Sequence, residues 1–269
     1  MNYYDLASTT PDVLEKIKLA EKEGRFSDHL DPIDYSHCLP VDGNFKFLYD
    51  WKTKFIYWWR NVYFLRWFNC ILNRCIFKTK IVGKENLKGI KAAVVTCNHI
   101  NKFDGLVVGY ALNHRKMRIM VADFNNHKGF LGKQMRAYGI LPFSRERDAN
   151  RNFQKAITWY LKNDHKVLFF PEGSEWWCYE KPRPFMDGAF HYAAANNVPI
   201  LPMFITFKKS GKFDKNGIEQ RHFTVHIMKP LYPNPELPKR DNTSMLKEKN
   251  YEECCKKYEE VYGKSVGEN

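Results

Sequence analysis

A histidine followed five residues later by an aspartate is a spacing that can support proton transfer. It occurs three times, at His29/Asp34, His37/Asp42 and His99/Asp104. A carboxylate that holds one imidazole nitrogen leaves the other nitrogen free to accept a proton. The first two pairs lie in an acidic stretch where no strand or apolar helix would position them. The third follows an apolar stretch, so we expect His99 to be a general base and Asp104 to orient it.

Two further segments would place reactive side chains at the ends of strands. They favour this catalytic interpretation over the alternative that Asp104 only closes a helix cap. A helix ending at Gly139 and a short strand lead to Arg145, and an apolar strand leads to Glu172 and Gly173. The carboxyl ends of parallel strands meet at one edge of a sheet, so a base, a cation and an acid would converge there. Each also has an ordinary interpretation, an ion pair for the arginine and a plain turn for the Glu-Gly pair.

The elements that would position these residues alternate between strand and helix. Apolar strands are expected at 92–97, 117–122, 140–144, 166–171, 199–207 and 222–228. Helices are expected at 102–113, 129–138, 148–161, 188–196 and 244–262. This alternation predicts an α/β fold, with a mostly parallel central sheet flanked by helices and preceded by an aromatic and basic N-terminal helical segment.

The composition of the 269 residues fits a folded domain with an anionic partner. At 44% hydrophobic the chain can bury a core, which excludes disordered and collagen-like classes. The net charge of +13 indicates nucleic acid, an acidic membrane surface or a phosphorylated substrate. The seven cysteines form no Cys-x-x-Cys pattern and follow no secretory signal, so neither disulfides nor a metal site are expected.

Charge divides the chain into segments with different expected roles. Residues 1–43 form an acidic extension with nine acidic and four basic residues, and contain a helix that begins after Thr10. Residues 44–80 carry eight basic residues and one acidic residue. Residues 81–235 hold the strand–helix alternation, and residues 236–269 a charged helix that we expect to pack on that domain.

The segment 44–80 has the composition of an interfacial membrane helix. It contains thirteen aromatic residues, and five of its basic residues fall on one stripe at 100° per residue: Lys52, Arg60, Arg66, Arg74 and Lys78. The helix is expected to be continuous or broken near Asn69–Asn73. A helix packed on the domain with snorkelling basic side chains is the alternative. No apolar stretch reaches the ~20 residues of a spanning helix, so we expect peripheral binding at the cytoplasmic face of an anionic membrane.

Four ordered motifs connect these residues. The first is Asn98, His99 and Asp104, the second Gly139 and Arg145, the third Phe170-Pro171-Glu172-Gly173, and the fourth Val198, Pro199 and Pro202. Together they resemble the glycerophospholipid (lysophospholipid) acyltransferase family, of the 1-acylglycerol-3-phosphate acyltransferase type. The resemblance covers about residues 60–230, with the order and spacing of the motifs intact.

The resemblance implies transfer of a fatty acyl group from an acyl-CoA or acyl-carrier-protein thioester to a lysophospholipid hydroxyl. The first acceptor it suggests is 1-acylglycerol-3-phosphate, which would give phosphatidic acid. His99 would deprotonate the hydroxyl, Asp104 would orient His99, and Arg145 would hold the acceptor phosphate. The other motif residues would bind the acceptor or shape the site floor: Asn98, Gly139, Glu172, Gly173 and Pro199. The resemblance also implies that no metal and no dissociable cofactor are needed. No nucleic acid is expected as a partner, since nucleic-acid-binding motifs are absent from the sequence.

Two positions depart from the family pattern by placing an acid where a phosphate-binding cation usually stands. They are Glu175, which follows the third motif, and Asp123, between the first two motifs. Candidates to replace the lost cations are Lys128, Lys133, Arg147, Lys181 and Arg183. Three alternatives therefore stay open: a zwitterionic or glycolipid acceptor, a non-catalytic lipid-surface protein of the same fold, and a nucleic-acid-binding protein. The intact His99/Asp104 pair argues against the second.

Overall fold

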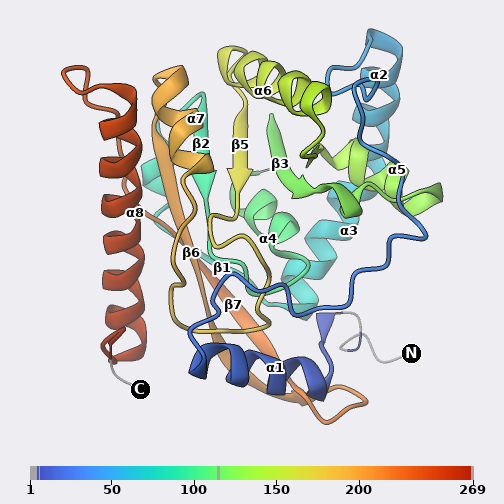
Figure 1. Ribbon diagram of the computed structural model, residues 1–269. Helices are drawn as coiled ribbons and strands as arrows, with labels where there is room; N and C mark the ends of the chain where they lie inside the picture. Colours follow the sequence, from blue (N-terminus) through green and yellow to red (C-terminus); the bar gives the residue numbers. More distant parts are fainter. Residues whose placement is uncertain (1–4, 6, 114–115, 268–269) are drawn as a thin grey trace.

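The computed structural model describes residues 5, 7–113 and 116–267, and a seven-stranded sheet forms its centre (Figure 1). The strands are β1 (Lys80–Val82), β2 (Ala93–Thr96), β3 (Met117–Ala122), β4 (Ile140–Phe143), β5 (Lys166–Phe169), β6 (Ile200–Phe213) and β7 (Glu219–Ile227). Their order is β1-β7-β6-β2-β5-β3-β4, and every neighbouring pair is parallel except β6 and β7. The expected α/β fold with a mostly parallel sheet is confirmed.

Helices cover both faces of the sheet because its central strands are apolar on both sides. In β2, Ala93 and Val95 face one core while Val94 faces the other, as the alternation of side chains along a strand requires. Helices α4 (Asp104–Ala111) and α5 (Gly129–Tyr138) contribute to the first core. Helices α6 (Arg147–Lys162), α7 (Gly188–Asn196) and α8 (Lys239–Tyr262) contribute to the second.

Several boundaries differ from those expected, mainly where exposed polar residues continue an element. The β6–β7 hairpin extends past the apolar stretch that predicts it, because antiparallel pairing continues into an exposed tip. Helix α8 begins five residues earlier than expected, at Lys239 rather than Ser244, because its first turn consists of polar residues outside the apolar pattern. The short β1, which pairs with β7, and the 3₁₀ turns η4 (Lys84–Leu87) and η5 (Asp123–Asn125) have no clear sequence signal.

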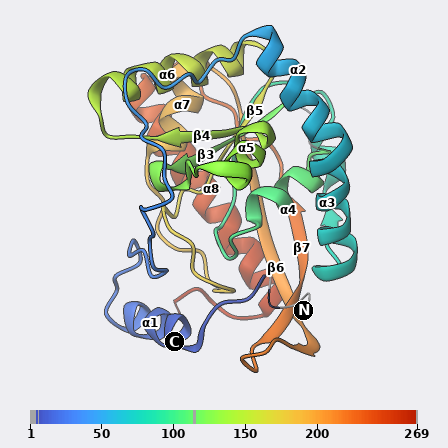
Figure 2. The same ribbon diagram turned by 90° about the vertical axis from the view of Figure 1, so that its right-hand side faces the viewer.

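The aromatic segment forms one continuous helix along the side of the molecule (Figure 2). Its parts are α2 (Trp51–Arg60), the π-helical turn η2 (Asn61–Leu65), α3 (Arg66–Ile71) and the π-helical turn η3 (Leu72–Ile76). The break considered near Asn69–Asn73 does not occur, because both side chains are buried and hydrogen-bonded. Asn69 Nδ2 donates to the Leu106 carbonyl at 2.9 Å, and Asn73 Nδ2 donates to Asn69 Oδ1 at 2.6 Å. We refer to residues 51–76 as the aromatic helix.

The N-terminal extension crosses the edge of the sheet at which β2 and β5 end (Figure 1). Helix α1 (Pro11–Lys22) begins after Thr10, as expected, and packs its apolar side against Trp176 and Trp177. Residues 24–43, here called the N-terminal strap, continue to the loop before α5. The strap joins that loop through two backbone hydrogen bonds of 2.7 Å. The extension is therefore built into the same edge of the sheet as the candidate catalytic residues.

Candidate active site

His99 and Asp104 meet in the turn between β2 and α4. His99 Nδ1 lies 2.9 Å from Asp104 Oδ2. Because α4 begins at Asp104 itself, His99 stays in the turn and the two side chains do not diverge around a helix. Within this turn, Asn101 Oδ1 accepts the Phe103 N–H at 3.1 Å. The structure thus brings the candidate base and its orienting carboxylate together.

The Asp104 carboxylate is fully buried, and N–H groups replace the lost water at one of its two oxygens, Oδ2. Besides contacting His99, Oδ2 accepts the backbone N–H groups of Ile100 at 2.6 Å and Asn101 at 2.8 Å. Burial is the larger influence and raises the pKa of Asp104 above its usual range, against the lowering effect of these hydrogen bonds. The N-terminus of α4 also favours a negative charge at this position. All these donors converge on the oxygen that holds His99.

The His99 ring is fixed by its neighbours yet still reachable. It stacks on Phe170 with 4.1 Å between ring centroids, and its side chain is 23% exposed. Because Nδ1 faces Asp104, Nε2 is the nitrogen left to accept a proton. This arrangement suits a general base.

Glu172 lies beside His99 because β2 and β5 are adjacent parallel strands. Its Oε2 accepts the His99 backbone N–H at 3.2 Å and pairs with Arg183 Nη2 at 2.8 Å. Both partners of this ion pair are almost completely buried. Arg183, one candidate to replace the lost phosphate-binding cation, is therefore engaged inside the protein. Any contact between Glu172 and an acceptor would have to compete with this pair.

Asn98 and Arg145 reach the same edge of the sheet with different surroundings. Asn98 Oδ1 accepts the Ile205 N–H at 2.7 Å and Nδ2 donates to the Ile205 carbonyl at 2.9 Å, so this amide ties the end of β2 to β6. Arg145 is exposed just beyond β4, at the outer strand. Gly173 has φ +83°, a backbone conformation that suits glycine in the turn after β5.

Gly139 and Pro199 lie at the opposite edge of the sheet, which corrects the expectation that they contribute to the site. Gly139 ends α5 with φ +109° and precedes β4, and a Cβ there would lie 2.9 Å from the Met117 carbonyl oxygen. Pro199 precedes β6, and its carbonyl accepts the Val94 N–H at 3.0 Å. Both residues are at the amino ends of strands that run in the same direction as β2, whereas His99 follows the carboxyl end of β2, so they shape the fold.

The N-terminal strap supplies an acidic side chain that the motifs do not predict. The carboxyl groups of Asp31 and Glu175 share a hydrogen bond, and the charge of Asp104 also acts on Glu175. Burial, with these two acids, raises the pKa of Glu175 to about 9, although Lys102 opposes the shift. Glu175 therefore keeps its proton at neutral pH.

Two other residues singled out in the sequence have clear positions. His29, on the strap, packs against the ring of Phe124. Its pKa is lowered mainly by burial, with the nearby His99 acting in the same direction. Asp123 is exposed in η5, where its carboxylate accepts the Phe124 N–H at 2.8 Å. The strap thus approaches His99, a proximity that no local spacing could predict.

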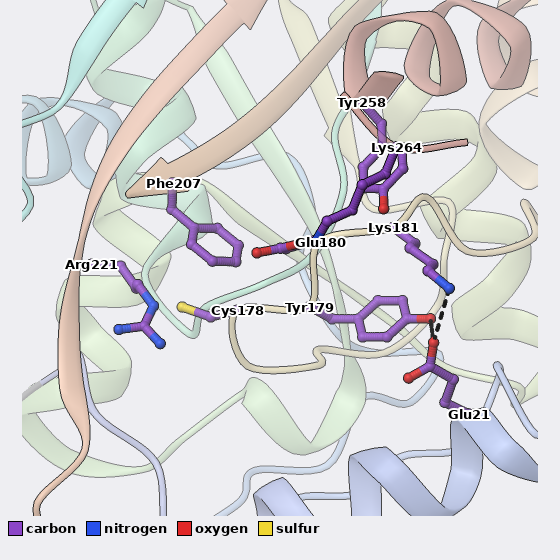
Figure 3. A pocket seen from close by; sticks show the side chains of 9 residues that line it. All are labelled: Glu21, Cys178, Tyr179, Glu180, Lys181, Phe207, Arg221, Tyr258 and Lys264. Carbon is purple, nitrogen blue, oxygen red and sulfur yellow. Dashed lines mark hydrogen bonds and ion pairs between the residues drawn. The ribbon is translucent and has the colours of Figure 1, made fainter. Parts of the chain in front are cut away.

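A separate cleft of about 510 Å³ lies between α1, the loop after β5, the β6–β7 hairpin and the end of α8 (Figure 3). Its lining residues are Glu21, Cys178, Tyr179, Glu180, Lys181, Phe207, Arg221, Tyr258 and Lys264. Glu21 accepts the Tyr179 hydroxyl at 2.8 Å and lies 3.5 Å from Lys181. Glu180 lies 3.5 Å from Lys264.

Over the described part of the chain, no group of three or more His, Cys, Asp or Glu residues is arranged to bind a metal.

Comparisons with known proteins agree with this geometry. Residues 78–206 match the family model described as Acyltransferase. The 1-acyl-sn-glycerol-3-phosphate acyltransferase of Saccharomyces cerevisiae is 28% identical over 156 residues, which are 56% of this chain and 51% of that protein. An uncharacterized acyltransferase of Schizosaccharomyces pombe is 30% identical over 133 residues, 48% of this chain and 47% of that protein. The chain matches about half the length of each of these two relatives.

The fold is also that of a solved acyltransferase. The crystal structure of the 1-acyl-sn-glycerophosphate (LPA) acyltransferase PlsC from Thermotoga maritima superposes with a TM-score of 0.52 and 13% identity, covering 79% of this chain and 95% of that one. The segment that matches the acyltransferase family model, residues 78–206, contains all four sequence motifs. The segment includes His99, Asp104, Arg145 and Glu172.

The raised pKa of Glu175 predicts how Glu175→Gln changes stability with pH. The folded protein holds this proton up to about pH 9, whereas an unperturbed Glu releases it near pH 4.5. The stability that the proton confers is thus complete below pH 4.5 and is lost as the pH rises to about 9. Glutamine mimics the protonated carboxyl, so the Tm of the variant minus that of the wild type should increase from pH 5 to pH 9 in calorimetry.

Glu180→Gln is the matched control, since Glu180 lies in the same loop and pairs with Lys264 near the surface. Its Tm difference should be small over the same range. A Glu175→Gln difference that stays constant from pH 5 to pH 9 would contradict the protonated state.

Proposed function

We propose that the protein transfers a fatty acyl group from an acyl thioester to the free hydroxyl of a lysophospholipid. The observation that carries this proposal is the 2.9 Å contact between His99 Nδ1 and Asp104 Oδ2, which leaves Nε2 available to a proton. The acyltransferase match of residues 78–206 supports the class of reaction. Acyl-CoA or acyl carrier protein presents the thioester, and the reaction requires no metal or dissociable cofactor.

The reaction can proceed by direct attack, without a covalent enzyme intermediate. His99 Nε2 takes the proton of the acceptor hydroxyl as its oxygen bonds to the thioester carbonyl carbon. The tetrahedral intermediate then collapses, the C–S bond breaks, and the leaving thiolate takes the proton from the imidazolium. Asp104 stabilises the imidazolium between the two proton transfers. The products are the acylated lipid and the free thiol.

The acceptor we propose is 1-acylglycerol-3-phosphate, which would yield phosphatidic acid. Two of the similar proteins are named for this acceptor. Arg145 is exposed at the same edge of the sheet as His99, and a guanidinium can bind a phosphate through two parallel hydrogen bonds. Glu175 is engaged with Asp31 and holds a proton, which reduces its repulsion of a phosphate.

We also propose that the aromatic helix binds an anionic membrane surface peripherally, at the cytoplasmic face. Helix α2 has no buried residue, and Trp51, Trp58 and Trp59 are each more than half exposed. Phe130 and Leu131 on the neighbouring α5 extend this apolar surface. Exposed aromatic patches flanked by Lys and Arg suit the interface of an anionic bilayer. In the described ranges of the chain, no helix has the length and apolar character to cross a membrane.

Replacing the candidate base tests the reaction directly. His99→Ala should lower kcat by about 10²–10⁴-fold, the range over which a general base contributes. The assay uses purified protein, a labelled acyl thioester and a panel of lysolipid acceptors. His37→Ala, which alters an exposed histidine paired with Asp34, serves as the control and should retain activity. Full activity in folded His99→Ala would exclude this mechanism.

The head group of the acceptor can be tested at Arg145. Arg145→Lys keeps the charge but loses the planar fork, so it should chiefly raise the KM for lysophosphatidic acid, by roughly tenfold for the loss of about one good hydrogen bond. Arg151→Lys, on the exposed side of α6, is the matched control. Competition between lysophosphatidic acid and lysophosphatidylcholine gives the wild-type preference. A clear preference for the choline lipid would replace the proposed acceptor with a zwitterionic one.

Membrane binding depends on exposed aromatic rings, and Trp58→Ala/Trp59→Ala removes two of them. Burying about half of one Trp side chain contributes roughly 2 kcal/mol, so the double variant should bind anionic vesicles at least about tenfold more weakly. Tyr232→Ala removes an equally exposed aromatic ring elsewhere and should bind as the wild type does. High salt should weaken wild-type binding. If the double variant sediments with vesicles as well as the wild type, another surface makes the contact.

A further inference from the structure

The ion pair of Glu172 and Arg183 holds the backbone of His99 at both of its polar groups. The Glu172 carboxylate accepts the His99 N–H at 3.2 Å, and Arg183 Nη2 donates to the His99 carbonyl at 3.4 Å. The Trp176 N–H donates to the same carbonyl at 3.0 Å. His99 is therefore fixed by its backbone as well as by its side-chain contact with Asp104.

The guanidinium of Arg183 is engaged on every side. Its Nε donates to Glu172 Oε2 at 3.2 Å, and its Nη1 donates to Ser174 Oγ at 3.0 Å and to the Phe26 carbonyl at 3.1 Å. Its Nη2 also donates to the Ser174 carbonyl. The planar group lies over the Trp176 ring, 4.7 Å from the centroid. Since only 1% of the side chain is exposed, Arg183 cannot act as a phosphate-binding cation on the surface.

These contacts join three segments that are distant in sequence: the turn after β2, the loop after β5 and the start of the N-terminal strap. A lysine could keep the positive charge but could not reach all these acceptors, because its ammonium is a compact group without the fixed fork of a guanidinium. Residue 183 must therefore be an arginine because of its geometry and not only because of its charge. The arginine sets the position of the His99 backbone, and that position determines the direction in which Nε2 points.

We propose that Arg183 is a positioning residue for His99, acting with Glu172 to fix the catalytic turn. The proposal rests on the acyl transfer proposed above. In this proposal Glu172, the glutamate of the third motif, acts by holding the His99 backbone. The N-terminal strap contributes by holding Arg183 through the Phe26 carbonyl. Misplacing a reacting group by about 1 Å can cost roughly 10²-fold in rate, so small shifts of this turn matter.

The test compares single variants with a double variant that removes both buried charges. Arg183→Lys and Glu172→Gln each leave one partner poorly compensated, so both should lower the Tm and lower kcat by about 10–100-fold, with KM changed less than about twofold. Glu172→Leu/Arg183→Met replaces the pair with apolar side chains, which often restores stability. We expect its Tm to exceed that of either single variant while kcat stays low.

A second measurement does not depend on catalysis. In ¹⁵N NMR of the full-length protein, the wild-type His99 ring should show the Nδ1–H tautomer hydrogen-bonded to Asp104, and Arg183→Lys should shift or broaden these signals below its Tm. Arg221→Lys is the control, because Arg221 lies over the Trp177 ring, 5.6 Å from its centroid, and its replacement should leave the His99 signals unchanged. Recovery of both Tm and kcat in the double variant, or unchanged His99 signals in folded Arg183→Lys, would overturn the proposal. If the wild type fails to transfer acyl groups, the NMR comparison still decides the positioning role.

Discussion

A buried carboxylate beside the reacting histidine is the constraint on which the site depends. An ionised carboxylate that leaves water is costly unless hydrogen-bond donors replace the water. Asp104 obtains its donors only if the chain turns sharply after β2 and α4 begins at Asp104. That turn is held in place by the loop after β5, whose Trp176 and Cys178 N–H groups donate to the His99 and Ile100 carbonyls. The first and third motifs are thus one hydrogen-bonded unit.

Three acids lie around His99, and each is neutralised in a different way. Asp104 accepts two backbone N–H groups through Oδ2, Glu172 is paired with Arg183, and Glu175 keeps its proton beside Asp31. These arrangements keep negative charge from accumulating next to a base that must become an imidazolium. The excess positive charge of the chain lies elsewhere, partly on the exposed side of the aromatic helix.

The features that sequence reasoning predicted are local ones. The alternation of apolar strands and helices predicts the fold. A histidine that follows a strand and precedes an aspartate by five residues predicts the catalytic turn. The expectation that Gly139 and Pro199 contribute to the site is wrong, although the sequence contains a signal against it. Both stand at the amino ends of strands, and in a parallel sheet that is the edge away from His99.

What could not be predicted depends on partners that are distant or irregularly spaced. Asp31 meets Glu175 across about half of the chain, and Arg183 reaches Glu172 within a loop that has no periodicity. The polar side chains of Asn69 and Asn73 suggest a helix break in the sequence. The break is absent because these side chains have buried partners, one of which is the Leu106 carbonyl in α4. Only the packed structure shows whether a buried polar group has a partner.

The docking of the N-terminal extension has a consequence for the order in which the chain can fold during synthesis. Helix α1 leaves the ribosome early, but the tryptophans that cover its apolar side are made much later. The contacts of Asp28 with Trp176 and of Phe26 with Arg183 span 148 and 157 residues. Closing such long loops is slow, so the apolar face of α1 stays uncovered while the sheet assembles. The nascent chain is therefore exposed to chaperones and to self-association until the loop after β5 has emerged.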